Sequence, residues 1–62
     1  MNLNGESLQF QGTVEQLLVN RSIVPRGIAV AINGEIVSKS AWATTTVQDS
    51  DVIEIVSAAA GG

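Results

Sequence analysis

The stretch Val52-Ile53-Glu54-Ile55-Val56 decides the fold, and Ser57-Ala58-Ala59-Ala60-Gly61-Gly62 follows it directly. The run of β-branched residues predicts a strand, with two isoleucines on one face and Val52, Glu54 and Val56 on the other. The six residues that follow carry only small side chains, so we expect a flexible tail over residues 57–62 and a folded domain over residues 1–56. Fully extended, this tail spans about 20 Å, which is long enough to enter a deep slot in another protein.

The two glycines at the end of the tail make the carboxylate of Gly62 the candidate working group. Glycine lacks a Cβ and accepts φ of either sign, so a partner could grip the tail closely, and we expect recognition at Ala60 and Gly61. Small residues are also common at chain ends, and at a glycine usage of about 7% a terminal Gly-Gly arises by chance in about one chain in 200. The dipeptide is a weak signal by itself, and its meaning depends on the domain before it.

Composition excludes several classes of site. The 62 residues include no cysteine and no histidine. This rules out disulfides, thiolate catalysis and cysteine-based zinc sites, and it removes the commonest general base and metal ligand. A domain of this size buries only about 60% of its unfolded surface, which leaves little room for a deep enzyme cleft. We therefore expect a protein that is not an enzyme and that binds no metal or cofactor itself.

Charge and hydropathy limit the classes of partner and the cellular location that we expect. Six acidic residues against three basic ones give a net charge of −3, and aromatic residues are scarce, which is the opposite of what nucleic-acid binding needs. The acidic balance fits a partner with a basic docking surface, and it equally serves solubility. The first residues lack the pattern of a secretory signal, and no apolar run approaches membrane-spanning length, so we expect no membrane contact and a cytoplasmic location.

The first twenty residues predict a hairpin followed by a helix. Asn4-Gly5 lies between two alternating segments and is a strong hairpin signal. Thr13 and Gln16 have the spacing of a helix capping box. The residues expected to face the core are Met1, Leu3, Leu8 and Phe10 from the hairpin and Val14, Leu17 and Leu18 from the helix.

A second hairpin is predicted in the middle of the chain, where Asn33-Gly34 joins an apolar strand over residues 27–32 to a return strand over residues 35–37. Trp42 is expected in a short helical turn over residues 40–43, as a lid on the core edge. The segment Asp49-Ser50-Asp51 has a turn composition. Its two carboxylates could touch a metal, but hard cations need six or more oxygens and nothing nearby completes the set.

This order of elements predicts an α+β domain in which one main helix packs on one face of a mixed sheet. The last strand should lie centrally, beside the first. The other face of the sheet would then carry small apolar residues and one glutamate, which form a candidate docking surface for a partner. Its expected members are Ala29, Ala31, Val52, Glu54 and Val56.

Over all 62 residues the chain resembles the ThiS family of ubiquitin-like, β-grasp sulfur carriers of thiamine biosynthesis. The resemblance rests on motifs in this order: Asn4-Gly5, Thr13-Val14-Glu15-Gln16-Leu17-Leu18, residues 30–37, Trp42, residues 47–56 and Gly61-Gly62. The chain departs from the family at Val37-Ser38-Lys39, where Val-Pro-Arg is common, and at Asp49-Ser50-Asp51, where Asp-Gly-Asp is common. Both departures lie in expected turns, so they affect local geometry more than function.

The resemblance implies covalent chemistry at Gly62. A ThiF-like adenylyltransferase would use ATP and magnesium to adenylate the carboxylate. A cysteine desulfurase or other persulfide donor would replace AMP with sulfur, and a ThiG-like thiazole synthase would take the sulfur from the resulting thiocarboxylate. The carrier would then be a co-substrate, which agrees with a chain that has no cysteine and no histidine.

Other functions share this architecture. They include sulfur carriers for molybdopterin synthesis or transfer-RNA thiolation and ubiquitin-like modifiers, which would join Gly62 to lysines of other proteins. A non-covalent β-grasp interaction module is an alternative of another class, in which the carboxylate is dispensable and the face around Val52 and Val56 carries the binding. An enzyme in its own right is the weakest alternative.

Overall fold

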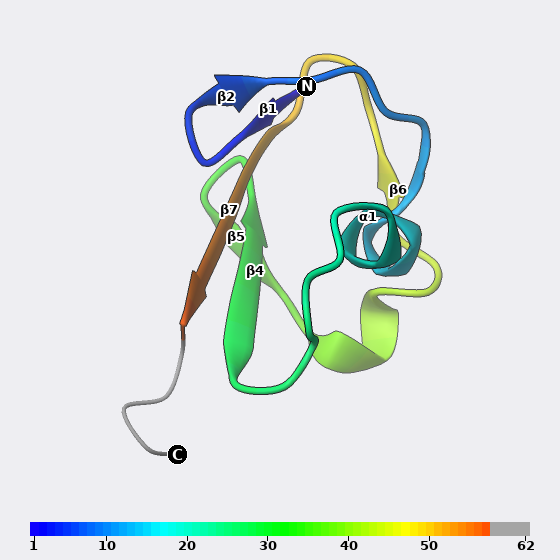
Figure 1. Ribbon diagram of the computed structural model, residues 1–62, viewed down its shortest axis with the longest axis vertical. Helices are drawn as coiled ribbons and strands as arrows, with labels where there is room; N and C mark the ends of the chain where they lie inside the picture. The colour runs from blue at the N-terminus through cyan, green and yellow to red at the C-terminus, as the bar shows by residue number, and fades with distance from the viewer. Residues whose placement is uncertain (58–62) are drawn as a thin grey trace.

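The computed structural model describes residues 1–57. In this part of the chain, a five-stranded sheet, one α-helix and a two-stranded ribbon make up the fold (Figure 1). The elements in chain order are β1 (Asn2–Leu3), β2 (Glu6–Ser7), β3 (Gly12–Thr13), α1 (Val14–Asn20), β4 (Ile28–Ile32), β5 (Glu35–Val37), the 3₁₀ helix η1 (Lys39–Ala41), β6 (Thr46–Val47) and β7 (Val52–Ser57).

The last strand is the centre of the large sheet, as predicted. The strand order is β2-β1-β7-β4-β5, with β7 parallel to β1 and antiparallel to β4. Five residue pairs join β4 to β7, from Ile32↔Ile53 to Ile28↔Ser57. The sheet is therefore mixed, and the predicted α+β class is confirmed.

Both Asn-Gly hairpins form as predicted because their turn residues adopt positive φ. Asn4 and Gly5 have φ of 51° and 89°, and Asn33 and Gly34 have φ of 53° and 86°. These values suit tight turns that follow the twist of the strands. The strands of the first hairpin are shorter than predicted. The segments still pair beyond the strands, because the amino group of Met1 donates to Leu8 O and Leu8 N donates to Met1 O, each at 2.9 Å.

The predicted capping box starts α1. Thr13 Oγ1 accepts from Gln16 N at 3.2 Å, and Gln16 Oε1 accepts from Thr13 N at 2.9 Å. Gly12 makes room for this arrangement: its φ is +148°, and a Cβ there would lie 2.5 Å from Gln16 Oε1. The helix begins where the sequence predicts because two otherwise unpaired amides are satisfied there.

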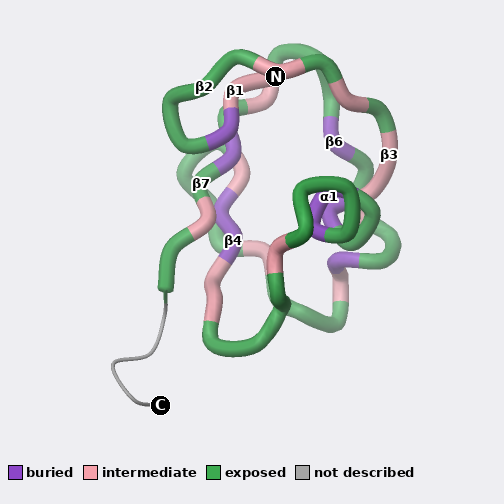
Figure 2. Tube along the Cα trace, viewed as in Figure 1, coloured by how far each residue is buried: buried purple, intermediate pink, exposed green. Residues whose placement is uncertain are grey.

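The core lies between the inner face of the sheet and α1 (Figure 2). The residues predicted to form the helix stripe are all buried, and Val14, Leu17, Val30 and Ile53 have no exposed surface. Trp42 closes one edge as predicted. It is buried, and its Nε1 donates to Val37 O at 3.0 Å.

One feature of the fold was not predicted. β3 and β6 pair antiparallel through Gly12↔Val47 and Thr13↔Thr46. Strands of two residues are too short to show a periodicity of two, so the alternation that predicts longer strands gives no signal here. This ribbon ties the start of α1 to the segment before β7, and Val14 N donates to Thr45 O at 2.9 Å beside it.

Candidate functional site

The outer face of the sheet, opposite α1, carries apolar side chains that the fold leaves uncovered. Val52 is 47% exposed and Val56 is 55% exposed, and Glu54 between them is also exposed. The alternation along β7 puts these three residues on one side and Ile53 in the core on the other. The sequence predicted this division of β7 correctly.

The two alanines predicted for this face contribute less to its surface. Ala29 pairs with Val56 and is half-buried, whereas Ala31 is only 9% exposed. Ala31 lies between Glu54 on β7 and Ile36 on β5, its partners in register. A methyl group between two longer side chains is largely covered, so Ala31 lies beneath its neighbours on this face and offers little surface to a partner.

Ile36 belongs to this face and was missed by the sequence analysis. It pairs with Ala31 and is 71% exposed, whereas the next residue, Val37, packs against the core. The signal was present, because a two-residue turn at Asn33-Gly34 places Ile36 directly opposite Ala31. We define the outer apolar face as Ala29, Ile36, Val52, Glu54 and Val56.

The outer apolar face continues directly into the tail. β7 ends at Ser57, which pairs with Ile28, so the strand reaches one residue beyond the predicted domain boundary. The predicted tail residues Ala60, Gly61 and Gly62 lie outside the described residues.

One of the two carboxylates of the turn before β7, that of Asp51, serves local structure. Asp51 Oδ2 accepts from Gln48 N at 2.8 Å, and Asp51 Oδ1 accepts from Asn33 Nδ2 at 3.0 Å. Within residues 1–57, no three Asp, Glu, His or Cys side chains are grouped so that they could hold a metal ion. No helix in this part of the chain is long and apolar enough to cross a membrane.

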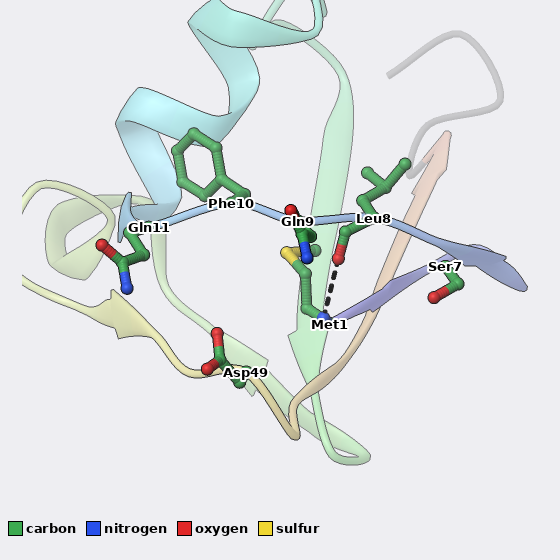
Figure 3. Close-up of a pocket in the computed structure, with 7 residues that line it drawn as sticks. All are labelled: Met1, Ser7, Leu8, Gln9, Phe10, Gln11 and Asp49. Carbon is green, nitrogen blue, oxygen red and sulfur yellow. Dashed lines mark hydrogen bonds between the residues drawn. The ribbon is translucent and has the colours of Figure 1, made fainter.

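An open depression near the N-terminus is a poor candidate for chemistry. Its lining is drawn in Figure 3 and consists of Met1, Ser7, Leu8, Gln9, Phe10, Gln11 and Asp49. The amino group of Met1 is already engaged by Leu8 O. The depression adjoins the loop before β7, whereas the last described residue, Ser57, lies at the far end of that strand (Figure 1).

Comparison with known proteins agrees with this arrangement. The model of the ThiS family matches residues 1–62. The chain belongs to the ThiS family. In a crystal structure, the thiamine biosynthesis protein ThiS from Geobacter metallireducens is 27% identical, with a TM-score of 0.85 over 98% of this chain and 96% of that one. A solution NMR structure from the same organism gives 27% identity and a TM-score of 0.75, over 98% of this chain and 85% of that one. The fold of this ThiS family member is thus the β-grasp, as predicted.

A curated relative shows the same domain within a longer protein. The thiazole synthase of Paramagnetospirillum magneticum is 44% identical over 62 residues, which cover 97% of this chain. The match covers only 19% of that relative, so this ThiS-family chain spans about a fifth of the length of the thiazole synthase that it matches.

Proposed function

We propose that this ThiS-family chain is a sulfur carrier of thiamine biosynthesis and that Gly62 is its site of covalent modification. The family match over residues 1–62 carries the proposal. The structural neighbours, which are named as thiamine biosynthesis proteins, support the pathway. The position of β7 supports the mechanism, because the central strand of the sheet ends at Ser57, where the predicted tail begins.

The proposed reaction begins with activation of a poor electrophile. A ThiF-like adenylyltransferase uses MgATP, the Gly62 carboxylate attacks the α-phosphorus, and pyrophosphate leaves. The terminal sulfur of a persulfide donor then attacks the acyl carbon and AMP leaves. Reduction of the resulting acyl disulfide by a thiol gives the thiocarboxylate. In this scheme the carrier is a co-substrate, and a narrow slot around Ala60 and Gly61 keeps water from the adenylate.

The outer apolar face is the proposed docking surface for the activating enzyme. Val52, Val56 and Ile36 offer apolar area, and Glu54 offers a charge for a basic group of the partner. Docking there would hold the domain while the adjoining tail enters the slot. The same face and tail would be presented to a thiazole synthase, a partner that the thiazole synthase relative supports.

Intact-mass spectrometry tests the proposal. The chain is incubated with a ThiF-like enzyme, MgATP, a persulfide donor and a reducing thiol, beside a control chain that lacks Gly62. We expect a mass gain equal to the exchange of one oxygen for sulfur in the intact chain and none in the control, with identical thermal melting of the two. If no gain appears, and no adenylate accumulates when the sulfur donor is omitted, the sulfur-carrier function is wrong.

Three further measurements, of lysine adducts, partner binding and thiazole formation, separate the alternatives. A ubiquitin-like modifier would give a product joined through Gly62 to a lysine of another protein. A non-covalent module would bind its partner equally well with and without Gly62. Carriers for molybdopterin synthesis or transfer-RNA thiolation would form the thiocarboxylate but would not support thiazole formation by a thiazole synthase.

A further inference from the structure

Asn4 lies in the first hairpin turn, but its side chain bonds to the strand that carries the tail. Its Nδ2 donates to Ile55 O at 3.1 Å, and its Oδ1 accepts from Ile55 N at 2.8 Å. The main-chain N of Asn4 also donates to Ile53 O at 2.9 Å. The side-chain amide thus satisfies both polar backbone groups of Ile55, as a neighbouring strand would.

This contact extends the pairing of β1 with β7 by one step. The last pair of that ladder is Leu3↔Ile53. Asn4 has positive φ, and the chain turns between β1 and β2 (Figure 1). Asp51 O accepts from Asn2 N of β1, and Ile53 O accepts from Asn4 N. The alternation of a strand therefore directs the polar groups of Ile55 and Ser57 to the same edge. Asn4 fills the position at Ile55, two residues before β7 ends.

The end of β7 is therefore held on both edges. On one edge, β4 pairs with β7 as far as Ser57. On the other edge, the side chain of Asn4 makes the last hydrogen bonds recorded between β7 and another described residue. Without its amide, Ile55 N and O would bond to water on this edge, and the last residues of β7 would be held by β4 alone.

Only asparagine meets both demands of this position. The φ of 51° favours asparagine or glycine among common residues. An aspartate could accept from Ile55 N, but its second oxygen would face Ile55 O with no proton to donate. Glycine would keep the turn and lose the contact to β7.

We propose that Asn4 is a positioning residue that holds the end of β7, the strand from which the tail starts, and thereby favours entry of Gly62 into the activating enzyme. The proposal rests on the function proposed above. It assigns to the hairpin turn a role in the chemistry of a residue at the other end of the chain.

The second hairpin supplies a matched control. Asn33 has nearly the same φ, 53°, and its side chain also bonds to β7, since Oδ1 accepts from Val52 N at 3.0 Å and Nδ2 donates to Asp51 at 3.0 Å. Asn33 thus holds the start of β7, whereas Asn4 holds its end. Asn33→Gly should remove a similar number of hydrogen bonds without affecting the end of β7.

The test compares Asn4→Gly, Asn4→Asp and Asn33→Gly with the unsubstituted chain. Amide hydrogen exchange by NMR reports on the contact itself: we expect exchange at Ile55 to accelerate about tenfold in Asn4→Gly, and less in Asn4→Asp, which keeps one bond. Pyrophosphate release by a ThiF-like enzyme with MgATP reports on activation. There we expect the KM for the carrier to rise about fivefold in Asn4→Gly, with kcat unchanged, and to remain unchanged in Asn33→Gly.

The two readouts separate the possible failures. If the unsubstituted chain is not activated, the proposed function fails and the role of Asn4 in activation fails with it. If that chain is activated and Asn4→Gly has the KM of Asn33→Gly, the positioning role alone is overturned. Unchanged exchange at Ile55 in a folded Asn4→Gly variant would overturn the contact on which the inference is built.

Discussion

On the inner face of the sheet, Val30 and Ile53 are completely covered, whereas on the outer face Val52, Val56 and Ile36 remain 47%, 55% and 71% exposed. The side chains on the two faces are chemically alike. β7 serves both faces, because its alternation sends Ile53 into the core and its neighbour Val52 to the surface.

This difference separates residues that fold the chain from residues that are available to a partner. Burial of Ile53 stabilises the isolated chain, since apolar area leaves water. Exposed apolar area on the outer face contributes no such stabilisation until another molecule covers it and removes it from water. Scattered surface valines are normal, but these lie together on the strand that leads into the tail, which is why we assign them to docking.

The largest expected effect contrasts Ile53 with Val52. Ile53→Ala should cost about 2–5 kcal/mol because it leaves a cavity in a covered core. A domain of this size is stable by only about 3–9 kcal/mol, so the variant should be partly or wholly unfolded at 25 °C. Val52→Ala, at the adjacent exposed position, should cost less than about 1 kcal/mol. Urea unfolding, monitored by tryptophan fluorescence, measures the free energy of unfolding of both variants. Similar decreases for the two would show that the two faces do not differ in their contribution to stability.

The next effect concerns binding and not folding. Val56→Ser should weaken docking to a ThiF-like enzyme by about 1–2 kcal/mol, the range of a moderate interface contact. Val19→Ser is the matched control, because Val19 is 75% exposed on α1, on the other side of the molecule. Calorimetric titration measures the Kd of each variant. Equal weakening by both substitutions would show that the outer apolar face is not the docking surface.

Most of the fold could be predicted from local signals. Asn-Gly turns need positive φ, a capping box satisfies amides within four residues, and the stripe of Val14, Leu17 and Leu18 follows from helix geometry. Each of these signals is contained in a few neighbouring residues. The central place of β7 followed from the order of the elements, and the division of its two faces followed from its alternation.

What escaped prediction depends on pairing between distant segments. The β3–β6 ribbon joins residues more than thirty positions apart, and the contact of Asn4 with Ile55 spans 51 positions. The cover over Ala31 comes from Glu54 and Ile36 on two different strands. The role of Gly62 is of another kind: it follows from the resemblance to a family and remains a prediction, because it depends on the partner's chemistry.

The smallest expected effect concerns a charge pair away from both faces. Arg21 Nη2 lies 3.3 Å from Glu6 Oε1, and both side chains are substantially exposed. Because water and salt screen such pairs, Arg21→Gln should change the free energy of unfolding by less than about 0.5 kcal/mol. Urea unfolding at low and high salt measures this, and any small difference should vanish at high salt. If Arg21→Gln instead lowered the free energy of unfolding as much as Ile53→Ala, the link between β2 and the end of α1 would contribute to stability as the core does. The contrast between the two faces of the sheet would then not be what governs folding.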